Sequence, residues 1–182
     1  MPRLAEYNEK EEIVQLLQNG ANVNEQDKYG YTALWNACAN NHTEIAEILL
    51  KNKKINTNLQ DDGGSSPFYF ACYDSYECVL IMLKDARVNV NLANNQGISP
   101  LMVTCYHEHT KTVQLLISFG RNIDILKKST KDAGDIKSGS TALDVAKRRN
   151  KTDIVQLLEQ YQNNPKETQK TLRNELNLKG KK

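Results

Sequence analysis

The sequence predicts an all-α repeat solenoid: a stack of about five helix-turn-helix units with short β-hairpin-like connecting loops, followed by a short C-terminal helix. The observation that decides this fold class is a motif, Gly-x-[Thr/Ser]-[Ala/Pro]-[Leu/Phe], that begins at Gly30, Gly64, Gly97 and Gly139. The intervals between these glycines are 64 − 30 = 34, 97 − 64 = 33 and 139 − 97 = 42 residues. A period near 33 residues indicates one supersecondary unit that recurs along the chain.

Two helices are expected in each unit. Within the motif, a hydroxyl residue such as Thr32 stands directly before an apolar run, where its side chain can cap the first helix. Further on, Ile45, Ile48 and Leu49 recur at the i, i+3, i+4 spacing of one buried helical stripe, which predicts the second helix. Equivalent stripes follow at Val79, Met82 and Leu83 and at Ile154, Leu157 and Leu158.

The predicted repeat domain spans residues 1–162. Its first unit, 1–26, lacks the opening turn and carries a charged outer face, which a terminal repeat exposed to water requires. Three units follow at about 27–60, 61–93 and 94–126, and a C-terminal cap unit covers 138–162. In this cap unit Lys147 stands where the other units have a small packing residue, as expected for an outward-facing end.

An insertion interrupts the pattern between the fourth and fifth units. The interval of 42 residues exceeds 33 by 9, and the extra residues fall within 126–137. In a solenoid such insertions map to loops on one face, often the binding face. The segment is also polar and contains Gly134, which is typical of a solvated, mobile loop. Both interpretations are open at this point.

The tail, residues 163–182, begins with helix-start signals. Asn164 can act as an N-cap, Pro165 suits the first helical position, and Glu167 stands three residues after the cap. Leu172 and a second leucine then lie one turn apart, so a short, weakly amphipathic helix is predicted. The closing Lys-Gly-Lys-Lys is expected to be disordered.

Composition and charge narrow the function classes. The chain has 182 residues with 24 basic and 22 acidic side chains, a net charge of +2 that does not call for a polyanion partner. The N-terminus lacks the apolar core of a signal peptide, and no apolar run is long enough to span a membrane, so an intracellular, cytoplasmic protein is expected. Cys38, Cys72 and Cys105 share one repeat position and are predicted, with Cys78, to be free thiols, the three of them small buried residues.

Further positions recur in step with the motif. They are the small residue three places after it (Ala37, Ala71, Thr104, Ala146), Asn41-His42 and Glu108-His109 at the turn between helices, and Val23-Asn24, Thr57-Asn58 and Val90-Asn91 at the unit ends. On these residues, over about 160 positions, the chain resembles the ankyrin-repeat family, in which Gly-His occupies the turn between helices.

The resemblance implies a binding surface. In ankyrin-repeat proteins the partner usually contacts the hairpin tips and the exposed face of each first helix, which together form a concave groove. Tyr, Trp and Arg, the residues enriched at interface hot spots, are frequent at the corresponding positions here. Alternatively, the tyrosines only cover neighbouring helix stems. Carried over position by position, the predicted partner-binding residues are Tyr7, Tyr29, Tyr31, Trp35, Asn40, Tyr73, Asp74, Ile98, Tyr106, His107, Arg148 and Arg149.

No catalytic constellation stands outside the repeats, so neither an enzyme nor a cofactor is expected. Cys105-x-His107-x-His109 is the one candidate metal pattern, but no second Cys/His pair lies nearby at zinc spacing, and no metal site is expected. His42 and His109 lie in the turn between helices, where a structural hydrogen bond accounts for them.

The predicted function is therefore that of a non-enzymatic protein-protein interaction module, monomeric by itself, of adaptor or inhibitor type. An immunity or antitoxin protein and an effector directed at a host cell are alternatives, since each would also act by binding. Lysine clusters such as Lys51, Lys53 and Lys54 suggest a nucleic-acid or membrane-surface binder. This reading is less favoured, because no aromatic residues are interleaved with the lysines.

Overall fold

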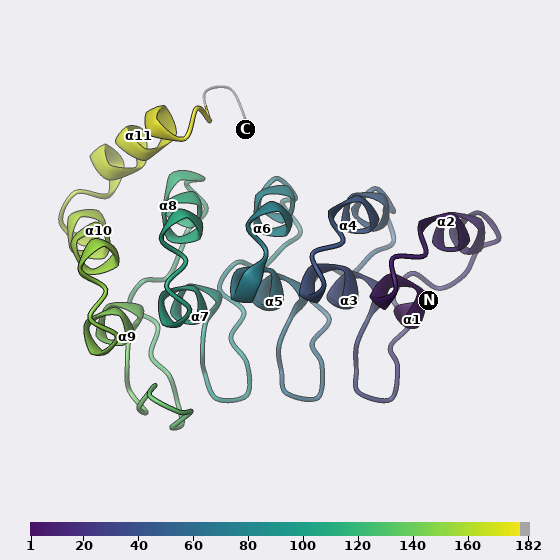
Figure 1. Ribbon diagram of the computed structural model, residues 1–182, viewed down its shortest axis with the longest axis horizontal. Helices are drawn as coiled ribbons and strands as arrows, with labels where there is room; N and C mark the ends of the chain where they lie inside the picture. Colours follow the sequence, from purple (N-terminus) through teal and green to yellow (C-terminus); the bar gives the residue numbers. More distant parts are fainter. Residues whose placement is uncertain (179–182) are drawn as a thin grey trace.

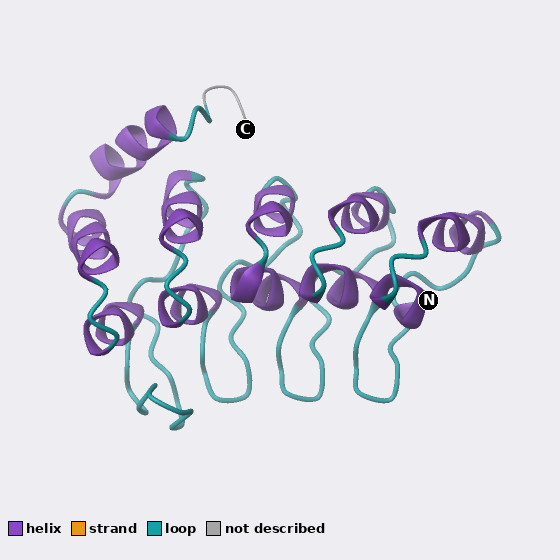
Figure 2. Cartoon of the chain, in the orientation of Figure 1, coloured by secondary structure: helices purple, strands orange, loops and turns teal. Residues whose placement is uncertain are grey.

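The computed structural model describes residues 1–178, and its helices stack in a single row of pairs (Figure 1). The first helices of the units form one layer, the second helices form another, and the connecting loops extend away from both on one side (Figure 2). The predicted all-α repeat solenoid with a C-terminal helix is confirmed. The helices are α1 (Pro2–Glu6), α2 (Lys10–Gln18), α3 (Ala33–Ala39), α4 (Thr43–Leu50), α5 (Pro67–Asp74), α6 (Tyr76–Leu83), α7 (Pro100–Tyr106), α8 (Thr110–Ser118), α9 (Ala142–Arg148), α10 (Thr152–Asn163) and α11 (Pro165–Glu175).

Each full unit starts its first helix in the same way. The hydroxyl of Thr32 accepts a hydrogen bond from the Trp35 N–H at 3.0 Å, which confirms the predicted cap. Ser66, Ser99 and Thr141 repeat this bond at the starts of α5, α7 and α9. In α5 and α7 a proline occupies the first turn, where no intrahelical N–H bond is lost.

The turn between the two helices places one residue in the left-handed backbone region. Asn41 (φ 56°) and Glu108 (φ 66°) take the position that is glycine in the resembled family. The next residue links neighbouring units, because the His109 Nε2 lies 2.7 Å from the Tyr73 carbonyl oxygen of the preceding unit, and His42 does the same with Glu6 at 3.0 Å. These contacts fit the structural role expected for both histidines.

The third unit departs from this geometry. A single residue, Ser75, separates α5 from α6, and its hydroxyl accepts the Cys78 N–H at 3.2 Å. Because α5 therefore runs through Tyr73 and Asp74, both side chains lie on a helix rather than in a turn.

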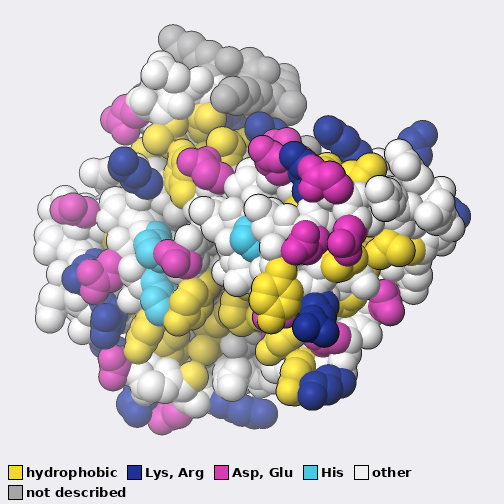
Figure 3. Space-filling model, turned by 45° about the vertical axis from the view of Figure 1, so that its right-hand side comes forward, with side chains coloured by type: hydrophobic (Ala, Val, Ile, Leu, Met, Phe, Trp, Pro, Cys, Tyr) yellow, Lys and Arg dark blue, Asp and Glu magenta, His cyan; other side chains and the backbone are white. Residues whose placement is uncertain are grey.

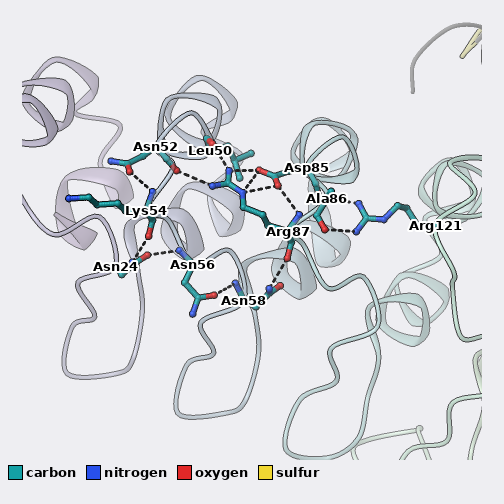
Figure 4. Close-up of polar contacts among 10 residues, drawn as sticks. All are labelled: Asn24, Leu50, Asn52, Lys54, Asn56, Asn58, Asp85, Ala86, Arg87 and Arg121. Carbon is teal, nitrogen blue, oxygen red and sulfur yellow. Dashed lines mark hydrogen bonds and ion pairs between the residues drawn. The ribbon is translucent and has the colours of Figure 1, made fainter.

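The second helices end without a glycine in the second and third units. In its place the Asn52 side-chain oxygen accepts the Lys54 N–H, and the Asp85 carboxylate accepts the Arg87 N–H, each at 2.9 Å (Figure 4). An arginine from the following unit then binds the exposed helix end: the Arg87 guanidinium donates to the carbonyls of Leu50 and Asn52.

Two more arginines repeat this contact farther along the stack. Arg121 donates to the carbonyls of Leu83 and Asp85 at the end of α6 (3.1 and 3.0 Å) and to that of Val88 (2.6 Å). Arg173, on α11, donates to the Ser118 carbonyl at the end of α8 (2.6 Å). Three guanidinium groups thus hold the C-terminal ends of three successive second helices.

The loops that connect units are joined by asparagines. The Asn24 amide donates to the Lys54 carbonyl at 2.9 Å and accepts the Asn56 N–H at 2.7 Å, and Asn58 repeats the pair with the next loop (Figure 4). Asn91 does so once more with Asn122 and Asp124. The Asn that closes each unit in the sequence therefore fixes the spacing between neighbouring loops.

The hairpins lie against one another at their tips. A Cβ added at Gly97 (φ +74°) would come within 2.6 Å of the Thr130 backbone nitrogen, whereas one added at Gly139 (φ +81°) meets no described atom within 4 Å. The left-handed backbone would strain an alanine at either position to the same extent. Only at Gly97 would the added Cβ also collide with the next loop. Gly97→Ala is therefore expected to lower the free energy of unfolding by about 1–3 kcal/mol more than Gly139→Ala. Urea denaturation of the two variants measures the difference, and equal losses would show that the loop around Thr130 yields freely.

The insertion, 126–137, is packed rather than purely solvated. The Thr130 N–H donates to the Gln96 carbonyl of the preceding hairpin at 2.8 Å, and the Ser129 N–H donates to the Ser140 carbonyl at 2.9 Å. Ile136 is buried, and Ala133 forms an antiparallel bridge with it. The expectation of a mobile, solvated loop is thus wrong for its ends and for Ile136, because backbone bonds on both sides and one apolar anchor hold the segment.

Helix α11 does not extend the row of helices but turns back across α10 to reach α8 (Figure 1). Leu172 and Leu178 are buried there, and Arg173 holds the end of α8. The predicted tail helix thus packs on the second helices α8 and α10 and leaves the first helices and hairpins open. The expected disorder of Lys-Gly-Lys-Lys concerns residues 179–182, which lie outside the described residues.

Candidate protein-binding surface

A continuous series of aromatic rings, here the aromatic belt, crosses the first helices and hairpins of three units. It starts on the hairpin at Tyr29, whose ring centroid lies 5.6 Å from that of Tyr31, and Tyr31 stacks on Trp35 at 3.9 Å. Trp35 contacts Phe70 of the next unit at 4.2 Å, and Phe70 stacks on Tyr73 at 6.1 Å. The belt consists of Tyr29, Tyr31, Trp35, Phe70, Tyr73, His107 and Tyr106.

The far end of the belt lies in the fourth unit. The His107 ring lies 4.0 Å from Tyr73 and 5.1 Å from Tyr106, so it joins the rings of α5 to those of α7. The Arg149 guanidinium then lies over the Tyr106 ring, 4.7 Å from its centroid. Figure 3 shows one face of the molecule on which hydrophobic side chains gather beside histidines. Six of the predicted site residues thus belong to one belt, and a seventh, Arg149, closes it.

Trp35 and Ile98 lie inside the protein, with exposed fractions of 7% and 5%. The indole N–H of Trp35 donates to the Asp61 carboxylate at 3.2 Å, and its ring lies between Tyr31 and Phe70. Trp35 and Ile98 were both predicted to contact a partner, but their burial leaves them little surface with which to do so. The size of Trp35 and its hydrogen bond to the next hairpin make it the floor that supports the belt, and Ile98 packs with the core.

The remaining predicted residues are more accessible. Tyr29 is 51% exposed and Tyr73 44%, and Tyr7, on the first unit, is 62% exposed. Tyr31, Tyr106 and His107 are half-buried, whereas Asn40 and Asp74 are exposed. Asn40 turns its side-chain amide back to the Asn36 carbonyl at 2.9 Å, so it ends α3 as well as facing solvent. A partner would therefore contact tyrosine faces more than any other side chain.

Arg148 and Arg149 are engaged within the protein. The Arg148 guanidinium donates to the Ser140 hydroxyl at 2.7 Å. That of Arg149 lies 3.2 Å from the Asp135 carboxylate of the insertion and 3.5 Å from Glu108. These ion pairs tie the insertion to α9 and to the end of the belt, so the two arginines support the surface from its edge.

His107 is expected to make the free energy of unfolding depend on pH. Burial, followed by the charges of His109 and Arg149, lowers its pKa below the ordinary value of 6.5. A histidine whose pKa is lower in the folded state binds fewer protons than in the unfolded state, so the free energy of unfolding falls as the pH drops below 6.5. His107→Gln is expected to reduce this loss. Urea denaturation at pH 7.5 and at about pH 5 checks it, and an unchanged pH dependence in the variant would assign the effect to other groups.

The four cysteines differ in acidity: a hydrogen bond with Cys38 lowers the pKa of the Cys78 thiol to about 7, although burial opposes this shift. All four are buried free thiols, and burial raises the pKa of Cys72 to about 12. Among residues 1–178 no group of three or more His, Cys, Asp or Glu side chains is arranged to hold a metal ion. In the same part of the chain no helix combines the length and the apolar character needed to cross a membrane.

Phe70 and Asp61 are two members of the surface that sequence reasoning did not select. Phe70 precedes Tyr73 by three residues on α5, so the spacing that brings side chains onto one helix face predicts their contact. Asp61 stands in the hairpin, and its bond to Trp35 spans 26 residues of sequence. No local pattern indicates that second contact.

The comparison with known proteins agrees with this architecture. The family described as "Ankyrin repeats (3 copies)" matches residues 3–92 and 82–169, most of the chain. A curated relative, Rabankyrin-5 of Mus musculus, is 41% identical over 68 residues, which cover 37% of this chain and 6% of that protein. The chain thus spans a small fraction of that relative's length. Since the family match covers more than half of the chain and the helix pairs repeat with its period, the chain belongs to the ankyrin-repeat family.

Proposed function

We propose that the protein is a non-enzymatic module that binds a partner protein through the concave surface carrying the aromatic belt, as an adaptor or an inhibitor would. Ankyrin repeats are in general protein-protein interaction modules, and a stacked solenoid offers a long rigid surface whose outer positions have no packing role. The single observation that supports this surface over others is the ring-to-ring continuity from Tyr29 to Tyr106 across three units.

The aromatic belt is partly exposed, but its rings are already held in place before a partner binds. Trp35, Phe70 and His107 fix their neighbours by ring contacts of 3.9 to 4.2 Å, so the exposed part of Tyr73 loses little freedom on binding. Tyr29 is held less closely, by Tyr31 at 5.6 Å. Preorganised aromatic side chains with a polar tip are the residues that dominate interface energies. The second helices are less suited, since α11 covers part of their face.

The test is affinity purification from a lysate of the source organism with the full chain as bait. We expect a stoichiometric protein to be captured by the wild type and lost with the double variant Tyr29→Ala/Tyr73→Ala. Both side chains are exposed, so the melting temperature should stay unchanged, which the same preparations verify. Tyr29→Phe/Tyr73→Phe keeps the ring faces and should retain the partner.

The matched control is Leu126→Ala, which removes a side chain that is 63% exposed on the insertion. Retention of the partner by this control and its loss from the tyrosine variant would support the proposed surface. Loss from the control alone would move the binding site to the insertion, and capture by all variants would exclude the belt.

A further inference from the structure

We propose that the N-terminal half of the belt binds a basic segment of the partner, with a lysine or arginine side chain of that segment between the Tyr73 ring and the Asp74 carboxylate. This inference rests on the proposed function, since it names the chemistry of the partner at the same surface.

Three positive charges at the C-terminal half of the surface have carboxylate partners, whereas the Arg148 guanidinium donates to the Ser140 hydroxyl. Arg149 pairs with Asp135 and Glu108, and Lys137 lies 3.3 Å from Asp132. Lys151 completes the group by pairing with Glu108 at 2.6 Å. Part of the positive charge there is therefore already compensated within the protein.

The N-terminal half is different, because its carboxylates lack such partners. Within residues 1–178, neither Asp61 nor Asp62 lies within 4.0 Å of a lysine or arginine nitrogen, and the charged neighbour of Asp74 is His109, at 3.9 Å. The side chain of Asp74 is 82% exposed. Burial, together with the carboxylates of Asp61 and Asp27, raises the pKa of Tyr31, which agrees with a negative potential at this end of the belt.

The exposed tyrosines show how this protein places cations. The Arg3 guanidinium lies 5.9 Å from the Tyr7 ring centroid and the Lys28 ammonium 4.8 Å from that of Tyr29. Tyr73, 44% exposed, is the third exposed tyrosine, and no cation of the described chain covers its ring. Contacts with Phe70 at 6.1 Å and with His107 at 4.0 Å hold the Tyr73 ring in place and leave part of it open to solvent.

Tyr73 and Asp74 are consecutive residues at the end of α5, so a partly exposed ring and an exposed carboxylate without a lysine or arginine partner lie next to each other. An ammonium or guanidinium there gains attraction from the ring quadrupole and from the carboxylate together. The apolar ring beside it, that of Phe70, suits the methylene stem or an apolar neighbour of the same residue. Charge complementarity thus selects a basic segment over an acidic one.

The experiment is selection of random displayed peptides on the full chain, followed by affinity measurements with the best peptide. We expect arginine or lysine beside apolar residues to be enriched. Asp74→Asn and Tyr73→Leu should each weaken that peptide about 5- to 30-fold, and replacing its basic residue by methionine should weaken it similarly. In the double change, Asp74→Asn together with the methionine peptide, the losses should not add.

Glu11→Gln is the matched control, since Glu11 is an exposed carboxylate on the terminal unit, and it should leave the affinity unchanged. Selected peptides that lose binding to Tyr29→Ala/Tyr73→Ala but lack basic residues would overturn the cation subsite and leave the proposed function standing. Peptides that bind this double variant as well as the wild type would count against the proposed function itself, and the cation subsite would fall with it.

Discussion

Phe68→Ala is expected to lower the free energy of unfolding by about 3–5 kcal/mol, the largest effect of any single change considered for this protein. The Phe68 side chain is fully buried in α5, in the middle unit of the stack. Truncation to alanine removes its contacts and leaves a cavity that close-packed neighbours fill only in part. Because each unit contacts only the next ones, damage at this place also weakens the coupling between the two halves of the stack.

Urea denaturation followed by circular dichroism measures this loss, and Phe68→Leu is the control. Leucine keeps most of the apolar volume, so the loss should stay below about 1.5 kcal/mol. We further expect the unfolding transition of Phe68→Ala to broaden, because weakened coupling lets one half unfold before the other. A small, equal loss for both variants would mean that the third unit is not the centre of the cooperative stack.

Arg121→Met is expected to lower the free energy of unfolding by about 2–4 kcal/mol although Arg121 contributes nothing to the apolar core. Its guanidinium donates to carbonyls of four residues of the preceding unit, among them Leu83 and Asp85 at the end of α6. Methionine keeps the apolar stem but leaves these helix-end carbonyls without their charged donor. For a chain of this size the melting temperature should fall by about 4–16 °C.

Two further variants test whether the fork-shaped guanidinium or its charge alone stabilises the protein. Arg121→Lys keeps the charge but can reach fewer carbonyls, so it should recover only part of the loss. Lys111→Met removes an exposed charge from α8 and should change stability by less than about 0.5 kcal/mol. If Lys111→Met destabilised the protein as much as Arg121→Met, net charge rather than the helix-end contact would be responsible.

The sequence alone predicts the architecture because the features that define it are local. The period near 33 residues, the hydroxyl caps at Thr32 and Ser99 and the helical stripe at Ile45 each depend on positions a few residues apart. The tail helix is predicted for the same reason, from Asn164 and Pro165. The sequence also shows that the usual glycine is missing after a second helix. It does not show how the helix ends there, with a side-chain-to-backbone turn at Asn52 and an arginine from the next unit.

The candidate surface is only partly predictable from the sequence. Aligning the units selects Tyr73 and Tyr106 at equivalent helix positions and Tyr29 on a hairpin, and the structure places all three on one belt. Alignment cannot distinguish an outward ring from one that turns inward to a neighbouring hairpin, as Trp35 does to reach Asp61. Exposure at such a position depends on what the next unit presents, and the next unit is distant in the sequence.

What the sequence by itself determined is therefore the repeat and its helices, since each follows from spacing within one unit. The tertiary structure alone decided which side chains meet. It joined Phe70 to Trp35, packed the insertion beside Arg149 and turned α11 back onto α8. The physical reason is that these contacts form between units. The same repeat pattern allows several arrangements of the side chains there, and side-chain size, a single ion pair or one buried isoleucine selects among them.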